Sequence, residues 1–341
     1  MTSGPIDAPR GVFKKLINDP FDVVDEALEG FVAAHAEVVA LVAPRVIGRR
    51  IPGQDKVGIV VGGGSGHEPA FVGYVGIGLA DAVACGNIFA SPSAAVALGA
   101  IQAADHGRGV VLLYGNYAGD VLNFGLAGQL AEAEGIVVRE FRVADDVASA
   151  PRAQANRRRG IAGMILVFKI AGAAAERGDS LEEVLRLARK ANDATYSMGI
   201  ALSACEVPGS GGPTFELPPG EIEIGMGLHG EPGIRRGPLE PVDALAEILV
   251  DTIVEDIVER ASGDVALLVN GLGATAHLDQ YILYRGARRA LEARGLRVVR
   301  SLVGEFITSL EMSGASLTVT VLDDELLALY DAPARGANFG W

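Results

Sequence analysis

The sequence is short of cysteine and of basic residues, and each shortage excludes a class of function. Two of the 341 residues are cysteines, Cys85 and Cys205, and each lies in an apolar stretch, so neither a disulfide framework nor a CxxC metal or redox site is available. The 29 lysines and arginines are outnumbered by 43 aspartates and glutamates, which gives a formal net charge of −14. Because the run 157–159 is the only basic cluster, we exclude nucleic acid as a partner and assign that run to a solvated face.

Long apolar runs are also missing. No stretch approaches the roughly 18 uninterrupted apolar residues of a membrane-spanning helix, and residues 1–16 lack the apolar core of a secretion signal. We therefore expect a cytoplasmic protein with no membrane partner. Hydrophobic residues still make up 49% of the chain, which is enough to bury the core of one large domain or two medium-sized ones.

Helical and strand-like segments alternate along the chain. In the first half, helices are predicted at 23–42, 93–104, 121–134 and 180–192, and strands at 57–61, 110–114 and 136–143. In the second half, strands are predicted at 196–204, 265–269, 297–303 and 316–322, helices at 241–260 and 274–293, and an irregular segment at 207–219. This alternation predicts two α/β domains in tandem, residues 1–194 and 195–341, each with a mostly parallel or mixed sheet covered by helices.

Two of the five histidines lie in glycine-rich turns. His67 stands in Gly-Ser-Gly-His-Glu-Pro, residues 64–69, directly after a predicted buried strand, where open α/β sheets bind ligands. His229 stands among the glycines of residues 225–233. Glycines around one polar side chain let the backbone approach a ligand closely, so both histidines are candidate site residues. The alternative, a histidine that is merely hydrogen-bonded within its turn, stays open for each.

A third candidate is Asp120, which ends the turn 115–120 at the start of a predicted helix. Its carboxylate is either a functional group or a helix N-cap, which is the commonest role of aspartate at such a position. A metal site built from His67, His229 and Asp120 would lack the paired histidines or clustered carboxylates that mark such sites, so we predict no bound metal. The histidines at 35, 106 and 277 are interpreted as structural or exposed.

The glycine loop at residues 62–66 does not match either common nucleotide motif. A dinucleotide fingerprint would need Gly or Ala where His67 stands, and Pro69 would interrupt the helix that should follow. A Walker A loop would need a Gly-Lys-Ser/Thr sequence, which does not follow. These mismatches argue against a nucleotide-dependent oxidoreductase, and we expect no cofactor bound by this chain.

Three long segments, residues 60–69, 116–120 and 225–233, together resemble the K subunit or K domain of the dihydroxyacetone kinase family, which includes erythrulose kinases. Residues 169–176, 194–203 and 308–318 look like further family segments in the same order. The resemblance implies a two-domain α/β protein that forms a homodimer. It also implies that His229 bonds covalently to the ketone carbon of a small ketose, as a hemiaminal.

The same resemblance assigns roles to other residues. Asp120 and His67 would flank the terminal hydroxyl that is phosphorylated, with Asp120 as the base and His67 orienting that hydroxyl. The loop formed by Gly64, Ser65 and Gly66 would contact the sugar. The nucleotide, ATP-Mg or ADP-Mg, would lie on a partner L subunit or a fused L domain.

One position departs from the family. Gly115 stands where dihydroxyacetone-specific relatives resemble one another in having a lysine that is expected to touch a substrate oxygen. Glycine removes a donor and is expected to open space, which predicts that a four-carbon ketose such as erythrulose fits at least as well as dihydroxyacetone.

Some K-like relatives bind the sugar and a transcription factor without catalysis, so a non-catalytic ketose-sensing co-regulator is the alternative function. A pure sensor would need only the capture residue, and the presence of Asp120 and His67 therefore favours the kinase.

Overall fold

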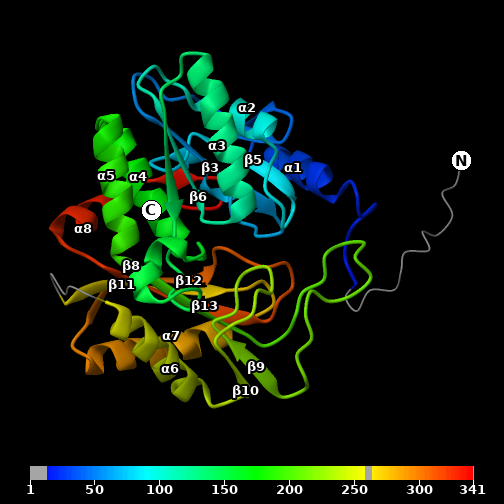
Figure 1. Ribbon diagram of the computed structural model, residues 1–341, viewed down its shortest axis with the longest axis vertical. Coiled ribbons are helices and arrows are strands. Elements are labelled where there is room, and N and C mark those ends of the chain that lie inside the picture. The colour runs from blue at the N-terminus through cyan, green and yellow to red at the C-terminus, as the bar shows by residue number, and fades with distance from the viewer. Residues whose placement is uncertain (1–13, 258–262, 341) are drawn as a thin grey trace, which may run out of the picture.

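The computed structural model describes residues 14–257 and 263–340, and in these residues the chain forms two large mixed sheets flanked by helices (Figure 1). This confirms the predicted fold class, an α/β protein with two sheet-containing halves. The first sheet is built before residue 144 and the second after residue 194. The exact boundary between residues 194 and 195 stays a prediction.

The first sheet has the strand order β1-β2-β5-β3-β6-β7. The strands are β1 (Val39–Ala43), β2 (Val46–Arg49), β3 (Gly58–Ser65), β5 (Ala82–Ile88), β6 (Val110–Gly115) and β7 (Val138–Val143). Strand β3 pairs in parallel with β5 and β6, and β6 with β7, whereas β1 and β2 add an antiparallel edge. The carboxyl ends of the parallel strands therefore share one edge of the sheet, where the loops that follow them can meet.

Helices cover both faces of this sheet. On one face α2 (Ala94–Ala104) packs against α3 (Ala118–Ala133), and on the other α4 (Met164–Arg177) packs against α5 (Leu181–Asp193). Helices α2 and α5 begin at Ser93 and Ser180, whose hydroxyls accept hydrogen bonds from backbone N–H groups in the first turn. Helix α1 (Val23–Ala34) contacts β1 at the sheet edge.

The second sheet has the order β10-β9-β8-β13-β11-β12 and is mostly antiparallel, with β11 and β12 paired in parallel. Its strands are β8 (Thr195–Ala201), β9 (Glu221–Ile224), β10 (Arg235–Pro238), β11 (Asp264–Gly271), β12 (Arg297–Glu305) and β13 (Gly314–Val321). Helices α6 (Val242–Asp256) and α7 (His277–Ala293) cover one face. The chain then returns to the first half, because α8 (Asp324–Tyr330) packs on α4 and β14 (Arg335–Gly336) pairs with β4 (Gly76–Ile77).

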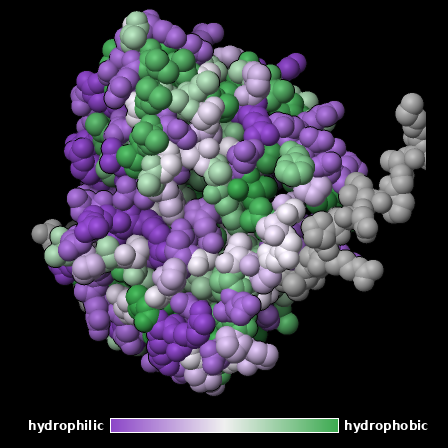
Figure 2. Space-filling view, turned by 45° about the vertical axis from the view of Figure 1, so that its right-hand side comes forward, coloured by the Kyte–Doolittle hydropathy of each residue, from purple (hydrophilic) through white to green (hydrophobic). Residues whose placement is uncertain are grey.

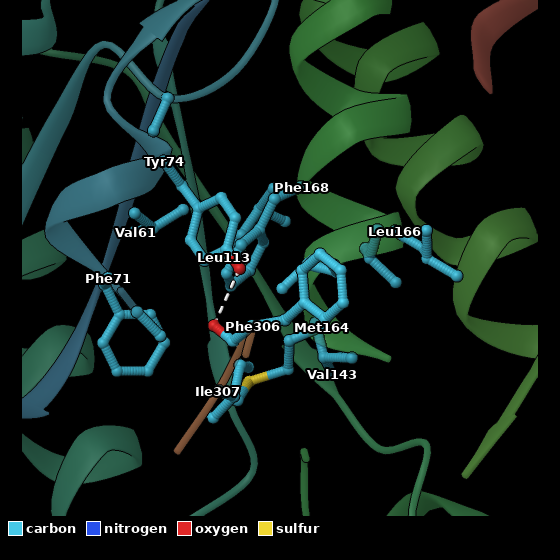
Figure 3. Close-up of a cluster of buried hydrophobic side chains, with 14 of the residues drawn as sticks. Val61, Phe71, Tyr74, Leu113, Val143, Met164, Leu166, Phe168, Phe306 and Ile307 are labelled. Atoms are coloured by element: carbon cyan, nitrogen blue, oxygen red, sulfur yellow. Dashed lines mark hydrogen bonds between the residues drawn. The ribbon is translucent and has the colours of Figure 1, made fainter. Parts of the chain in front are cut away.

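The hydrophobic core is continuous between the two sheets. Val61 of β3 and Phe168 of α4 belong to one buried cluster with Leu268 of β11. Phe306, which follows β12, enters the same cluster beside Tyr74, as Figure 3 shows. The two sheets are therefore held together by shared burial of apolar side chains, and the loops at their junction are fixed relative to one another.

Two predicted helices end earlier than expected. The helix predicted at 23–42 stops at Ala34, and residues Val39–Ala43 form β1 instead, because β-branched valines suit a half-buried edge strand. The helix predicted at 241–260 is α6, which ends at Asp256, and residues 258–260 lie outside the described residues. Helix α7 begins at His277, three residues later than predicted.

Helix α4 was not predicted. Almost all of its residues are buried, from Met164 to Ala175, because it lies between the first sheet and the core shared with the second. The apolar run at its start, residues 164–168, cannot be told from a buried strand by periodicity alone.

The surface in Figure 2 shows apolar patches separated by hydrophilic side chains. No helix in residues 14–257 and 263–340 is long and apolar enough to cross a membrane.

A buried ion cluster stabilises the first half. Asp81 is 2% exposed and accepts from Arg49, from Lys56 at 2.6 Å and from the backbone N–H of Ile59 at 2.9 Å. Burial raises the pKa of Asp81, but the neighbouring His106 and Lys56 outweigh it and leave the pKa below its ordinary value.

We expect Asp81→Asn to lower the free energy of unfolding by about 3–5 kcal/mol at pH 7, because the buried Arg49 and Lys56 lose the nearer of their two carboxylate partners and keep only Glu176. Since the folded-state pKa lies below the unfolded-state value of about 4, this stabilisation is complete above about pH 5 and disappears as the pH falls through the folded-state pKa. Urea unfolding at pH 7 and pH 3.5 measures both effects. Glu292→Gln, which breaks the exposed Arg288 pair, is the control and should leave the urea midpoint unchanged. A constant difference between wild type and Asp81→Asn at the two pH values would contradict the expectation.

Candidate active site between the two sheets

Three loops carry the predicted site residues to the junction of the two halves. His67 follows β3, Asp120 lies in the first turn of α3 after β6, and His229 lies between β9 and β10. The structure brings the two histidines together, with His67 Nε2 3.1 Å from His229 Nε2. His229 also acts electrostatically on the Asp120 carboxylate, and a shared site of all three side chains stays a prediction.

His67 is 3% exposed and its ring is fixed on both sides. Its Nδ1 lies 2.7 Å from the carbonyl oxygen of Thr308. Because a carbonyl can only accept, Nδ1 carries the proton and Nε2 of the neutral ring has a free lone pair. Burial and the neighbouring His229 lower the pKa of His67 to about 3, so the neutral ring persists at physiological pH.

His229 is held by Glu231. The Glu231 carboxylate accepts from His229 Nδ1 at 2.9 Å and from the His229 backbone N–H at 3.0 Å. Burial raises the pKa of Glu231, but the hydrogen bond and charge of His229 outweigh it and lower that pKa to about 2. Glu231 therefore stays ionised and keeps the Nδ1 proton of His229 directed at itself, so Nε2 is the ring nitrogen of His229 that faces His67 and can act as a nucleophile when it carries no proton.

Two aromatic rings enclose the histidine pair. Phe89 stacks on His67 with ring centroids 4.8 Å apart and meets His229 edge-on at 5.3 Å. Tyr117 meets His229 edge-on at 4.9 Å, and its hydroxyl donates to the Gly160 carbonyl. These contacts restrict rotation of His229, whose side chain is 25% exposed, so that it stays accessible to a ligand in one orientation.

Asp120 is 8% exposed, and its Oδ1 is buried without a hydrogen-bond partner among the described residues. Burial raises the pKa of Asp120 to about 6, against the opposing effects of Ser91 and His229. The N-cap alternative is wrong, because the cap position of α3 is Tyr117 and Asp120 lies within the first turn. A buried carboxylate with a free oxygen and a pKa near neutrality suits a general base.

The loop of Gly64, Ser65 and Gly66 lies against the chain that follows β5. A β-carbon on Gly64 would lie 2.6 Å from the Ala90 backbone nitrogen, and Gly66 has a φ of +93°, so both positions require glycine. The Ser65 hydroxyl donates to the Gly86 carbonyl at 2.8 Å. That bond occupies its proton, and the contact of this loop with a sugar stays a prediction.

Gly115 does not open the space that was expected. A β-carbon there would lie 3.0 Å from the Tyr117 ring and 3.1 Å from Met164 Sδ. The position is closely packed behind Tyr117, and the expectation that a four-carbon ketose fits at least as well as dihydroxyacetone stays a prediction.

The basic run is also not a solvated face throughout. Arg158 is 4% exposed and makes two hydrogen bonds to Asp256, at 2.6 and 2.8 Å. Arg159 donates to Asp146 at 2.9 Å and to the Gly225 carbonyl at 3.3 Å, and Gly225 begins the loop that carries His229. The run therefore ties the His229 loop to the first half of the chain.

Sequence reasoning did not identify Phe89, Glu231 and Thr308 as site residues. Glu231 had a usable signal, since an acid two residues after a turn histidine can reach its ring. The carbonyl of Thr308 had no signal, because a backbone acceptor is independent of side-chain identity. Phe89 had no signal either, because its ring contacts residues that are distant in the sequence. In residues 14–257 and 263–340 no group of three histidine, cysteine, aspartate or glutamate side chains could hold a metal ion.

Comparison with known proteins identifies the family. A family model described as the Dak1 domain matches residues 29–338. The chain belongs to the Dak1 family. The resemblance to K units of dihydroxyacetone kinases is thereby confirmed.

Relatives of this Dak1 chain include both separate subunits and longer kinases. It is 43% identical to the dihydroxyacetone-binding subunit DhaK of PTS-dependent dihydroxyacetone kinase 2 from Listeria innocua, over 96% of this chain and 99% of that subunit. It is 45% identical to an L-erythrulose kinase from Pectobacterium atrosepticum, over 95% of this chain and 56% of that kinase. The Dak1 chain thus spans nearly all of the first relative and about half of the second.

The matching solved structures likewise include a chain of similar length and a longer kinase. A dihydroxyacetone kinase from C. freundii in complex with AMP-PNP and Mg²⁺ matches with a TM-score of 0.84 and 35% identity, over 96% of the Dak1 chain and 61% of that chain. A dihydroxyacetone kinase operon co-activator, DhaQ, matches with a TM-score of 0.85 and 35% identity, over 92% of the Dak1 chain and 97% of the co-activator chain. The fold is therefore common to a kinase and to a co-activator.

We expect His67 to remain neutral from pH 8 to pH 5, because its pKa is lowered to about 3. Ring ¹⁵N chemical shifts measured over that range should show a protonated Nδ1 and an unprotonated Nε2 throughout, with the His67 signals assigned by their loss in His67→Asn. A change of the His67 shifts to those of a doubly protonated ring above pH 5 would contradict this electrostatic description.

Proposed function

We propose that this chain is the substrate-binding unit of a small-ketose kinase, which holds dihydroxyacetone or a four-carbon ketose such as erythrulose for phosphorylation. The observation that supports this most strongly is the His229 Nε2 atom, which lies 3.1 Å from His67 Nε2 while its own Nδ1 is bound to Glu231. The family and its named relatives, a dihydroxyacetone-binding subunit and an erythrulose kinase, support the substrate class.

In the proposed capture step, His229 Nε2 adds to the ketone carbon of the sugar. A nitrogen–carbon bond forms, the carbonyl π pair moves to oxygen, and one proton passes overall from Nδ1 to that oxygen. Glu231 supports the loss of the Nδ1 proton because it accepts the hydrogen bond at 2.9 Å. Nothing leaves, so the product is a hemiaminal with the mass of the whole ketose. A polyol such as glycerol has no carbonyl and cannot react.

In the proposed transfer step, Asp120 accepts the proton of the terminal hydroxyl as that oxygen attacks the phosphoryl donor. The free Oδ1 of Asp120 is available for this contact, and a pKa near 6 leaves the carboxylate ionised at neutral pH. His67 would orient the same hydroxyl through Nε2, the ring nitrogen that faces His229.

The phosphoryl donor belongs to the partner in this proposal. An L subunit or L domain would carry ATP-Mg or ADP-Mg. In support, this chain matches only 61% of the kinase that was solved with AMP-PNP and Mg²⁺, so that kinase has a further part. We further propose that the unit works in the cytoplasm as a homodimer.

A second candidate is a ketose-sensing co-activator, because the fold matches DhaQ as well as it matches a kinase. Such a protein needs capture at His229 but has no use for Asp120. The two candidates therefore differ in whether transfer occurs after capture.

Capture is tested by mass spectrometry of the intact chain with dihydroxyacetone, D-erythrulose, L-erythrulose, glycerol and erythritol. We expect an adduct equal to the whole ketose, without loss of water, and no adduct with either polyol. His229→Ala should abolish the adduct, whereas His277→Ala, a change on the exposed start of α7, should retain it. The ketoses are ranked by their half-saturating concentrations. Absence of any ketose adduct under gentle ionisation would overturn covalent capture.

Transfer is tested with Asp120→Asn and a nucleotide-loaded L subunit. We expect kcat to fall by about 100- to 10,000-fold, the usual contribution of a general base, while the adduct at His229 still forms. In the wild type, kcat/KM should rise with pH through about 6, because the ionised form of Asp120 in the free chain is the active one. Adduct formation without transfer in the wild type, with any L partner, would favour the co-activator.

A further inference from the structure

The segment 306–310, between β12 and β13, contacts both histidine loops, and we call it the bridging segment. Its Thr308 carbonyl accepts from His67 Nδ1, and the Thr308 N–H donates to the His67 carbonyl at 3.1 Å. Leu310 N–H donates to the Gly66 carbonyl at 2.9 Å. On the other side, the Ser309 hydroxyl donates to the carbonyl of Leu228, the residue before His229. The position of this one segment therefore sets the position of both rings.

One buried side chain holds the start of the bridging segment. Asn270, at the end of β11, has no exposed surface. Its Oδ1 accepts from the N–H groups of Phe306 and Ile307, both at 2.9 Å, and its Nδ2 donates to the Ile307 carbonyl at 2.9 Å and to Ser316 Oγ at 3.2 Å. The two backbone donors require an oxygen and the carbonyl requires an N–H, so the orientation of the amide is fixed.

A second contact holds the same segment from the first half of the chain. The buried Tyr74 hydroxyl donates to the Phe306 carbonyl at 2.8 Å, the bond drawn in Figure 3. Three of the contacts of Asn270 and the contact of Tyr74 thus fix residues 306 and 307. Thr308 is the next residue in the chain, so loss of the Asn270 or Tyr74 contacts to residues 306 and 307 would move the Thr308 carbonyl.

We propose that Asn270 is a positioning residue that acts through the bridging segment: it fixes the Thr308 carbonyl that keeps His67 protonated on Nδ1 and holds His67 Nε2 facing His229. This deepens the proposed function and rests on it. A displacement of about 1 Å in a catalytic group can lower turnover about 100-fold, so the clamp matters more for rate than for binding.

The test compares Asn270→Asp with Ser316→Ala. The aspartate keeps the shape and the acceptor for the two N–H groups, but it replaces the donor to the Ile307 carbonyl by a second oxygen. We expect the His67 ring ¹⁵N shifts to show loss of the single Nδ1-protonated form and kcat to fall by about 10- to 100-fold with KM changed less than about threefold. Ser316→Ala removes the other acceptor of the same amide, away from the bridging segment, and should leave the His67 shifts and kcat within about twofold of wild type.

Tyr74→Phe provides a variant without a new buried charge, in case Asn270→Asp does not fold. It removes the second contact to residue 306 while keeping the ring, so it should give the same change in His67 shifts with a smaller loss of kcat. Wild-type His67 shifts in every variant that folds, or equal effects of Ser316→Ala and Asn270→Asp, would overturn the proposal.

The two hypotheses fail separately in this design. If the wild-type chain forms no ketose adduct and supports no transfer, the proposed function fails, while the ¹⁵N shifts still report whether Asn270 fixes the state of His67.

Discussion

The site depends on one hydrogen bond, from His67 Nδ1 to the carbonyl of Thr308. This bond joins a loop of the first sheet to a loop of the second, so it forms only when the two halves are docked. It also determines chemistry, because it fixes which ring nitrogen of His67 carries the proton. The continuous core between the sheets supports it by burying Phe306 two residues before Thr308. Packing of apolar side chains between the two sheets therefore fixes the Thr308 carbonyl, and that carbonyl fixes the protonated nitrogen of His67.

Two carboxylates beside the histidines have opposite properties. Glu231 receives a hydrogen bond and positive influence from His229, and its pKa falls to about 2. Asp120 is buried with a free oxygen, and its pKa rises to about 6. Environments that separate the pKa values of neighbouring acids are typical of sites with divided roles. Here Glu231 stays ionised and orients His229, whereas Asp120 has a pKa near neutrality and is the acid suited to exchange a proton.

The sequence predicted the α/β class and the residues that carry chemistry, because strand–turn–helix transitions and glycine-rich turns are local signals. His67, Asp120 and His229 could therefore be named before their proximity was known. The contacts that join them could not, since they depend on which loops the tertiary fold brings together. The carbonyl of Thr308 has no side-chain signature, and Phe89 lies in an ordinary strand-to-helix connection. Helix α4 was missed because its apolar run, residues 164–168, cannot be told from a buried strand by periodicity alone.

The remaining question is why a fold shared with a co-activator should carry Asp120 in its present state. The proposed capture of a ketose by His229 would use Glu231 for orientation and has no step that involves Asp120. A buried acceptor without a donor costs about 1–3 kcal/mol of stability. A protein that only binds the sugar would bear this cost without benefit. A protein that phosphorylates the sugar regains it when the substrate hydroxyl donates to the free oxygen, and the arrangement of Asp120 therefore favours the kinase.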